Sequence, residues 1–169
     1  MTLFTQRLSM YQMEESDWPL FLALHRDPQV LKYCFDMPME SLIRNRFEIR
    51  LPKWNTKSRH PLCLLIINNK TKQPVGVTGF AYDGETAELG YLLLPEYFNK
   101  GYATESLRAV IDWAWKECGI RQFKAVVTRG NIGSEKVLSK CGLTHTDTLF
   151  KVHTIGEKLY DDLIYTLKV

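Results

Sequence analysis

Apolar residues in this chain fall into short alternating or continuous runs, separated by segments with helical periodicity. The short runs predict strands, because alternation places every second side chain on one face and a continuous run suits a strand buried on both faces. These predicted strands are Arg7–Met10, Leu62–Ile67, Val75–Tyr82, Ala87–Leu94, Phe123–Val127, Thr146–Val152 and Leu159–Leu167. The polar turn at residues 68–70 makes the second and third of them a hairpin.

Four segments have the spacing of amphipathic helices, namely Trp18–His25, Ser41–Arg50, Thr104–Cys118 and Ser134–Cys141. The longest places Leu107, Val110, Ile111 and Ala114 on one face, and Gly119 is a typical helix end. The order β-αα-βββ-α-β-α-ββ predicts an α/β fold, with a mixed sheet in one layer and helices on its faces. No repeat or linker interrupts the chain, so we expect a single domain over residues 1–169.

The most informative stretch runs from Glu88 to Glu105. Its apolar strand stops at Pro95, and after a short polar turn Asn99–Ala103 opens a helix. A strand that passes through a glycine turn into a helix N-terminus forms an anion cradle, because free N–H groups and the positive end of the helix dipole both face the turn. The small residue Gly101 lets a phosphate approach the backbone. This arrangement predicts a phosphate-bearing ligand.

Composition excludes several classes of function. A net charge of +3 from 22 basic and 19 acidic residues is too balanced for a DNA-binding protein. The longest apolar run, Leu62–Ile67, is too short to span a membrane. The four histidines lack metal-ligand spacing, so we expect no metal. The four cysteines form no CxxC pair and no secretory signal opens the chain, which favours the reducing cytoplasm.

Three groups of residues stand in order along nearly the whole chain. They are Thr5, Arg7, Leu8 and Met10 with Asp17; Glu88-Leu89-Gly90-Tyr91 with Pro95-Glu96-Tyr97 and Lys100-Gly101-Tyr102-Ala103-Thr104-Glu105; and Asn131-Ile132-Gly133-Ser134 with Val137-Leu138 and Lys140-Cys141-Gly142-Leu143. Together they resemble the GNAT superfamily of acetyl-CoA-dependent N-acetyltransferases, and within it the RimJ/RimL-type branch. The resemblance implies a twisted, mostly antiparallel sheet of about seven strands, with helices on both faces and splayed central strands at the acetyl-CoA site.

The same resemblance implies how acetyl-CoA, the cosubstrate, would be held. Leu92, Leu93 and Leu94 would offer backbone groups to the pantetheine arm and one N–H to the thioester oxygen. The pyrophosphate would lie on the turn made of Phe98, Asn99, Lys100, Gly101, Tyr102, Ala103 and Thr104. Phe98 stands where the superfamily usually has Gln or Arg. The alternative to a cofactor site is that Leu92–Leu94 belong to an ordinary core strand and that Gly101 only starts the following helix.

Asn131 and Ser134 open the last helix, where both residue types are common caps. By resemblance, Asn131 would instead bond the cofactor arm, and Ser134 would lie near the sulfur and protonate the departing thiolate. The tyrosine acid used elsewhere in the superfamily would fall at Leu138 and is absent. Its loss matters little, because a thiol with a pKa of about 8.5 is a tolerable leaving group.

A general base is more important, because amines are largely protonated at neutral pH. Glu88 matches the position of a superfamily base, although a strand carboxylate can equally face solvent or pair with a neighbour. A late glutamate used by some RimL-like members is missing, and Asp147 or His145 could replace it through a water. Glu105 is interpreted as a first-turn residue that complements the helix dipole. Cys141 is interpreted as a core residue rather than a nucleophile for ping-pong chemistry.

The predicted function is transfer of acetyl from acetyl-CoA to a primary amine, by direct attack in a ternary complex. The acceptor is expected to be a protein N-terminal α-amine of the ribosomal-protein type, with a small amine (polyamine, aminoglycoside or amino-acid analogue) as the alternative. A non-catalytic CoA-binding module and a protein-docking module are the rival classes, and a homodimer is an open option. Acceptor choice would fall to residues 27–54 and 152–158, where Asp36, Glu40 and Glu48 could receive a cation.

Overall fold

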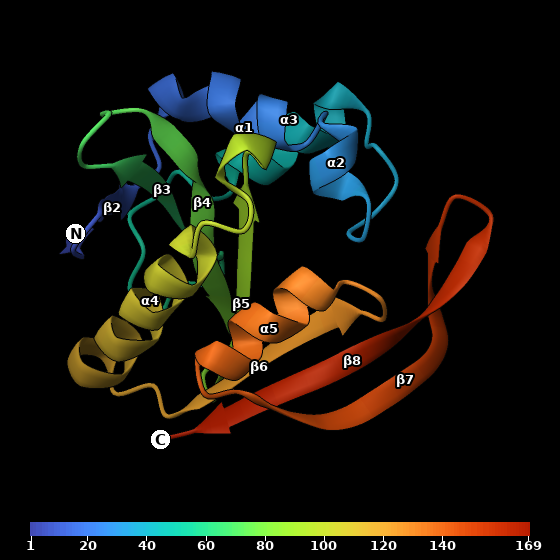
Figure 1. The fold of residues 1–169 in the computed structure, drawn as a ribbon. Helices are drawn as coiled ribbons and strands as arrows, with labels where there is room; N and C mark the ends of the chain where they lie inside the picture. Colours follow the sequence, from blue (N-terminus) through green and yellow to red (C-terminus); the bar gives the residue numbers. More distant parts are fainter.

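The apolar runs form one eight-stranded sheet in the computed structural model, which describes residues 1–169 (Figure 1). The strands are β1 (Thr2–Phe4), β2 (Leu8–Gln12), β3 (Leu62–Asn68), β4 (Pro74–Tyr82), β5 (Thr86–Leu93), β6 (Gln122–Thr128), β7 (Thr144–Ile155) and β8 (Lys158–Lys168). Their order is β1-β2-β3-β4-β5-β6-β8-β7, and only β5 and β6 are parallel. The mixed, mostly antiparallel sheet is confirmed. The eighth strand is β1, three residues that are too few to show a pattern.

Five helices cover the sheet, and two short 3₁₀ segments lie at Glu15–Asp17 (η1) and Pro95–Tyr97 (η2). The helices are α1 (Trp18–Leu24), α2 (Pro28–Leu31), α3 (Glu40–Glu48), α4 (Tyr102–Cys118) and α5 (Ile132–Lys140). Four of them were predicted, with ends that differ by a few residues. The additional helix, α2, is a single turn, and the Asp27 side chain caps it.

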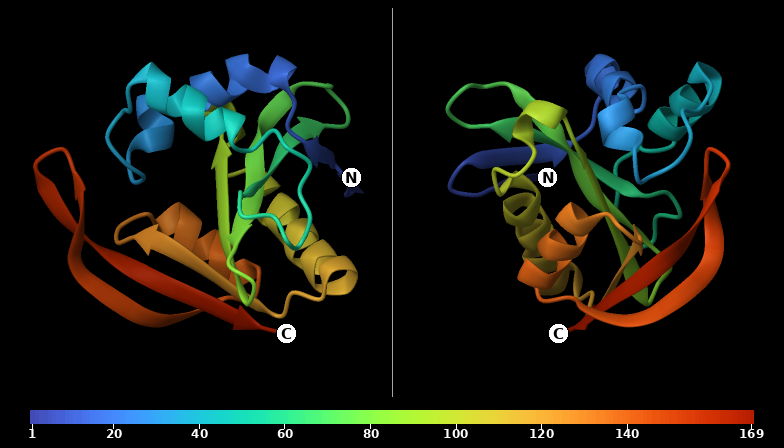
Figure 2. Two further views of the ribbon diagram at one scale, coloured as in Figure 1. Left: turned by 180° about the vertical axis from the view of Figure 1, so that it is seen from behind. Right: turned by 45° about the vertical axis from the view of Figure 1, so that its right-hand side comes forward.

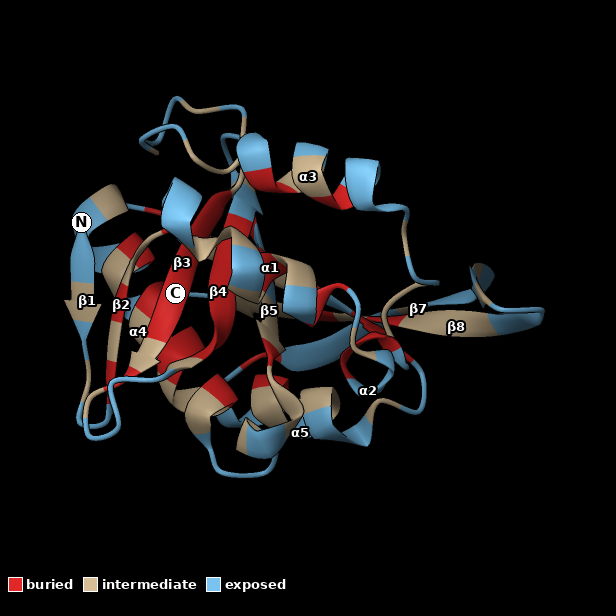
Figure 3. Ribbon diagram, turned by 90° about the horizontal axis from the view of Figure 1, so that it is seen from above, coloured by how far each residue is buried: buried red, intermediate tan, exposed pale blue.

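The helices divide between the two faces of the sheet (Figure 2). A core of 24 buried residues fills the space between the sheet and α4 and α5. A second cluster of eight buried residues lies between α1, α3 and the opposite face, and Ile43 and Phe47 of α3 are fully buried in it. Figure 3 shows the buried residues gathered in the central strands, with exposed residues on the outer sides of the helices. No helix is both long enough and apolar enough to cross a membrane.

The two parallel strands at the centre of the sheet separate after a short contact. Thr86, Ala87 and Glu88 pair with Gln122, Phe123 and Lys124, and no further pairs join β5 to β6. On its other side, β5 pairs with β4 along seven positions, from Gly76↔Leu93 to Tyr82↔Ala87. A gap therefore opens between β5 and β6 toward the end of β5 that leads into α4. This is the splayed pair of central strands that the sequence predicts.

Candidate active site

A cleft of about 280 Å³ occupies the gap between the splayed strands. Residues 89–91 of β5 form one wall and residues 125–128 of β6 the other, while Asn131, Ser134 and Leu138 of α5 close one side. The structure thus brings the predicted residues of α5 next to the predicted strand. Leu138 is buried, so no side chain with a proton to donate projects from that position.

The backbone of β5 directs alternate N–H groups to its two neighbours, as an antiparallel ladder requires. The N–H of Leu94 donates to the Val75 carbonyl on the β4 side at 2.9 Å, and the Leu94 carbonyl accepts from the Tyr97 N–H at 2.9 Å. The N–H of the preceding residue, Leu93, therefore faces the gap toward β6, whereas that of Leu92 faces β4. Of the three predicted leucines, only Leu93 has an N–H group directed to the β6 side, and none of the three is among the residues that line the cleft.

The turn after β5 has the geometry of an anion cradle. Asn99 has φ 58° and Gly101 has φ 80°, both in the left-handed region, and α4 starts at the next residue. Gly101 is the N-cap and makes no side-chain cap. The first N–H to bond within the helix is that of Glu105, which donates to the Gly101 carbonyl at 3.0 Å. The N–H groups of residues 102–104 are therefore free, and the turn itself is exposed.

The N-terminal segment is clamped onto the start of α4, a contact that the sequence did not reveal. The Glu105 carboxylate accepts from the Thr5 hydroxyl at 2.6 Å and from Arg7 Nε at 2.6 Å. Arg7 Nη1 donates to the Lys100 carbonyl at 3.0 Å, which places a cation beside the turn. Burial alone would raise the pKa of Glu105, but the hydrogen bonds from Thr5 and Arg7 outweigh it and hold that pKa below its ordinary value.

A pair of hydroxyls connects β5 to α5 inside the cleft. The Tyr91 hydroxyl donates to Ser134 Oγ at 2.9 Å, and burial raises the pKa of Tyr91 to about 12. The side chain of Asn131 accepts from the Ser134 N–H at 3.3 Å, so it acts as a helix cap. Its role toward a cofactor stays a prediction. Sequence reasoning used Tyr91 only as part of a motif and missed its contact with Ser134, 43 residues away.

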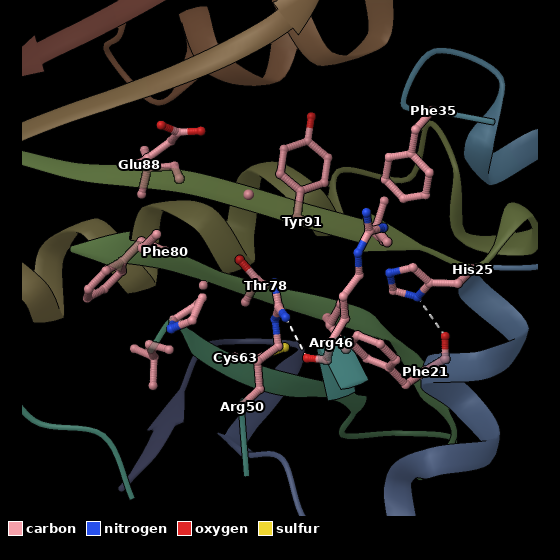
Figure 4. A pocket seen from close by; sticks show the side chains of 18 residues that line it. Phe21, His25, Phe35, Arg46, Arg50, Cys63, Thr78, Phe80, Glu88 and Tyr91 are labelled. Atoms are coloured by element: carbon pink, nitrogen blue, oxygen red, sulfur yellow. Dashed lines mark hydrogen bonds between the residues drawn. The ribbon is translucent and has the colours of Figure 1, made fainter. Parts of the chain in front are cut away.

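A second cavity, of about 420 Å³, lies on the α1 and α3 side of β4 and β5 (Figure 4). Both cavities are lined by Leu89, Gly90 and Tyr91, so both border this part of β5. The larger cavity has aromatic and charged walls. Its side chains include Phe21, His25, Phe35, Arg46, Arg50, Thr78 and Glu88.

Glu88 borders the larger cavity and is also paired with a neighbouring strand. Its Oε2 lies 3.0 Å from Lys124 Nζ of β6, and its side chain is 46% exposed. The structure therefore shows this carboxylate paired with a neighbouring strand, which is one of the alternatives to catalysis, and its catalytic role stays a prediction. Neither His145 nor Asp147 lines either cavity, and His145 Nε2 instead lies 3.0 Å from the Thr148 hydroxyl on β7. The geometry does not favour these two as replacement bases.

The remaining candidate residues have structural partners. Cys141 is buried, and burial raises its thiol pKa to about 11, which fits the core role. Asp36 accepts from the Gly156 N–H at 2.6 Å, Glu40 pairs with Arg26, and Glu48 pairs with Arg44. None of these three acids lines the larger cavity, so they do not form the cation site that the sequence suggested. No group of three or more His, Cys, Asp or Glu side chains is arranged to hold a metal ion.

Splayed parallel strands beside an uncapped helix start define the class of acetyl-transferring enzymes that this geometry resembles. The pattern of the acetyltransferase (GNAT) domain family matches residues 7–144, and the chain belongs to this family. It is an acetyl-transferring enzyme.

Relatives and solved structures agree with this assignment. An uncharacterized N-acetyltransferase of Bacillus subtilis, YnaD, is 26% identical, and the match covers 99% of this chain and 96% of that one. The structure of RimL, a ribosomal α-N-protein acetyltransferase in complex with coenzyme A, superposes with a TM-score of 0.85 at 18% identity, over 100% of this chain and 98% of that one. Spermidine N-acetyltransferase from Vibrio cholerae, with CoA and spermine, has a TM-score of 0.81 at 15% identity, over 97% and 96%.

Proposed function

We propose that the protein transfers acetyl from acetyl-CoA directly to a primary amine, with both substrates bound together. The observation that carries this proposal is that the cleft and the larger cavity both border Leu89–Tyr91 of β5. A donor in one and an acceptor in the other would touch across β5. A two-step reaction would need a reactive thiol, but Cys141 at the end of α5 is buried, with a thiol pKa raised to about 11. Burial also raises the pKa of Cys34, the thiol that lines the cleft, which disfavours its thiolate. Direct attack is therefore favoured over an acetyl-cysteine intermediate.

Acetyl-CoA would lie along β5 with its pyrophosphate on the turn from Phe98 to Thr104. The free N–H groups of Tyr102, Ala103 and Thr104 would bind the phosphates, and Arg7 would add positive charge beside them. The pantetheine arm would follow residues 92–94 and contact Asn131. The Leu93 N–H would face the thioester oxygen and stabilise the negative charge that develops there, an effect worth about 3–4 kcal/mol where tested in enzymes.

In the reaction, the amine nitrogen bonds to the acetyl carbon while the carbon–sulfur bond breaks. Glu88 would take the proton that the attacking amine loses, directly or through a water, and Lys124 at 3.0 Å orients its carboxylate. Ser134 would deliver a proton to the departing thiolate, and the Tyr91 hydroxyl, which stays protonated because burial raises its pKa, would hold Ser134 in place through its hydrogen bond. The thiolate is stable enough that this second transfer contributes less than the first.

For the acceptor, the α-amine of a protein N-terminus remains the first candidate and a small amine the second. Structural neighbours of both kinds exist, since RimL is named for a ribosomal protein and the Vibrio cholerae enzyme for spermidine.

All four cysteines are free thiols, which supports a place in the reducing cytoplasm.

Two measurements on the purified protein test the proposal. Calorimetric titration with acetyl-CoA reports cofactor binding, and thiol release with a panel of peptides, polyamines, aminoglycosides and amino acids reports transfer. Binding with turnover supports the proposal. Binding without turnover on any amine would favour a CoA-binding module, and absence of binding to the folded protein would favour a docking domain.

A further inference from the structure

Two arginines that line the larger cavity have no acidic partner. Arg46 lies in the last turn of α3, and Arg50 follows two residues after the end of that helix. Arg46 stacks its guanidinium over the ring of Phe35, with Cζ 5.1 Å from the centroid. Arg50 Nη1 donates to the Arg46 carbonyl at 2.5 Å. Neither forms an ion pair, whereas Arg44 of the same helix pairs with both Glu15 and Glu48.

These two side chains line one cavity and are partly shielded from water. Burial, and secondarily the positive charge of Arg46, lowers the pKa of Arg50. Two cations in one partly buried site without a counter-ion are unfavourable, and a bound anion would offset both the desolvation and the mutual repulsion. A guanidinium also presents paired N–H donors that match the two oxygens of a carboxylate or phosphate.

The other polar groups of the cavity fit a bound ligand. The hydroxyl of Thr78 is buried, with 2% of the residue exposed, and has no hydrogen-bond partner. His25 Nδ1 lies 2.8 Å from the Phe21 carbonyl, which can only accept, so this nitrogen carries the proton. Burial lowers the pKa of His25, and the ring is neutral at pH 7. Apart from Glu88, the polar lining of the cavity therefore consists of cations and neutral groups.

Figure 4 shows how these groups are arranged. Glu88 lies at the left of the cavity, Thr78 lies near its middle, and Arg46 and His25 lie at the right. In this view the Glu88 carboxylate of β5 stands at the opposite end of the cavity from the Arg46 guanidinium, and Arg50 lies below Thr78 between them. An acceptor that carries a cationic amine at one end and an anion at the other would match this separation of charge.

We propose that the acceptor is a small amine that carries its own anionic group, a carboxylate or a phosphate, bound by Arg46 and Arg50 while the amine faces Glu88. This inference rests on the proposed acetyl transfer, and for the acceptor it favours the second candidate, a small amine, over a protein N-terminus. The unpartnered Thr78 hydroxyl would bond a polar atom between the two ends. Amino acids and amino-acid analogues are the most compact molecules with this arrangement. Polyamines, which have cations at both ends, are disfavoured.

The test uses pairs of acceptors that differ only in the anion. Each α-amino acid is compared with its primary amide, and phosphoethanolamine with ethanolamine, by thiol release from acetyl-CoA. With the native protein, we expect the anionic member of at least one pair to have the lower KM. Arg46→Gln and Arg50→Gln should each raise that KM by about 10- to 100-fold, leave kcat within about threefold, and leave the neutral member unchanged. Arg44→Gln, on the same helix but outside the cavity, is the matched control.

A second readout separates this inference from the proposed reaction. Calorimetric titration of the CoA-loaded protein with the same amino acids and phosphoethanolamine measures acceptor binding without turnover. Binding that both arginine variants lose would support the anion site even if no acetyl were transferred. Turnover of neutral amines and polyamines at equal or lower KM, unaffected by either variant, would overturn it while leaving the acetyltransferase intact. Because Arg50 also bonds the end of α3, Arg50→Lys and a thermal melt check that any loss is not a loss of fold.

Discussion

The start of α4 provides the sharpest test of how this protein would hold its cosubstrate. Gly101 has φ 80°, a conformation that a β-branched residue adopts only with strain, and a Cβ there would lie 3.3 Å from Arg7 Nη2. Valine would also place methyl groups over the free N–H groups of residues 102–104. We therefore predict that Gly101→Val weakens acetyl-CoA binding through the loss of these phosphate contacts.

The size of the effect follows from the hydrogen bonds at risk. Bonds from N–H groups to a charged phosphate contribute about 1.5–3 kcal/mol each. Loss of two at the lower value gives about 3 kcal/mol, which is roughly a 150-fold increase in Kd. The left-handed backbone would add about 1–2 kcal/mol of strain, but that strain lowers the free energy of unfolding rather than the affinity of the folded protein.

Gly119 offers the matched control because it ends the same helix. It has φ 70°, and a Cβ there would meet nothing within 4 Å. Gly119→Val should thus reduce stability by a similar amount and leave acetyl-CoA affinity unchanged. Calorimetric titration and a denaturant melt of both variants make the comparison. A folded Gly101→Val protein with a Kd within about threefold of the native value would refute the cradle, and equal losses in the two variants would show an effect through helix stability alone.

Three further predictions concern the chemistry and the pH dependence. Glu88→Gln should leave acetyl-CoA binding intact and lower turnover near neutral pH by about 10²–10⁴-fold. The control Glu85→Gln, at a residue that lines neither cavity, should have no effect. A Glu88→Gln enzyme with the full rate would exclude Glu88 as the base. Ser134→Ala and Tyr91→Phe should each lower kcat by less than about tenfold. The double variant should lose no more activity than the worse single variant, because the two hydroxyls act as one hydrogen-bonded pair. Additive losses would contradict this coupling. Because the pKa of His25 is lowered in the folded protein, the unfolded chain binds this proton first as the pH falls. The contribution of His25 to stability is therefore complete above about pH 6.5 and is lost below that pH. The free energy of unfolding, measured by denaturant melts at about pH 8 and about pH 5, should differ less between the two pH values in His25→Gln than in the native protein. An unchanged difference would count against the neutral, buried His25.

The fold was predictable because its signals are local. The continuous run of β3, the glycine turn before α4 and the amphipathic face of α4 each depend on neighbouring residues. The two elements that escaped, β1 and α2, contain three and four residues, which is too short for a hydrophobic pattern to repeat. The splayed strands followed from the family resemblance and not from the pattern, since a missing ladder leaves no mark on hydrophobic periodicity.

The site was predicted in part for the same reason. The turn from Phe98 to Thr104 is contiguous, so its free N–H groups could be inferred from the sequence. The contact between Arg7 and Glu105 joins residues 98 positions apart, and that between Tyr91 and Ser134 joins residues 43 apart. Such pairs depend on how the helices lie on the sheet. No spacing along the chain encodes that placement.

The acceptor side shows why residue type alone misleads. The sequence from 27 to 54 contains acids and arginines in similar numbers, and the acids suggested a site for a cation. Helical geometry separates their roles, because a turn of about 3.6 residues puts Arg46 and Arg50 about 40° apart but Arg44 and Arg46 about 200° apart. Burial of Ile43 and Phe47 fixes the rotation of α3, which leaves Arg44 with its carboxylates outside and directs Arg46 into the cavity. The packing of one helix therefore decides which charges of this segment line the cavity, and these are the two arginines.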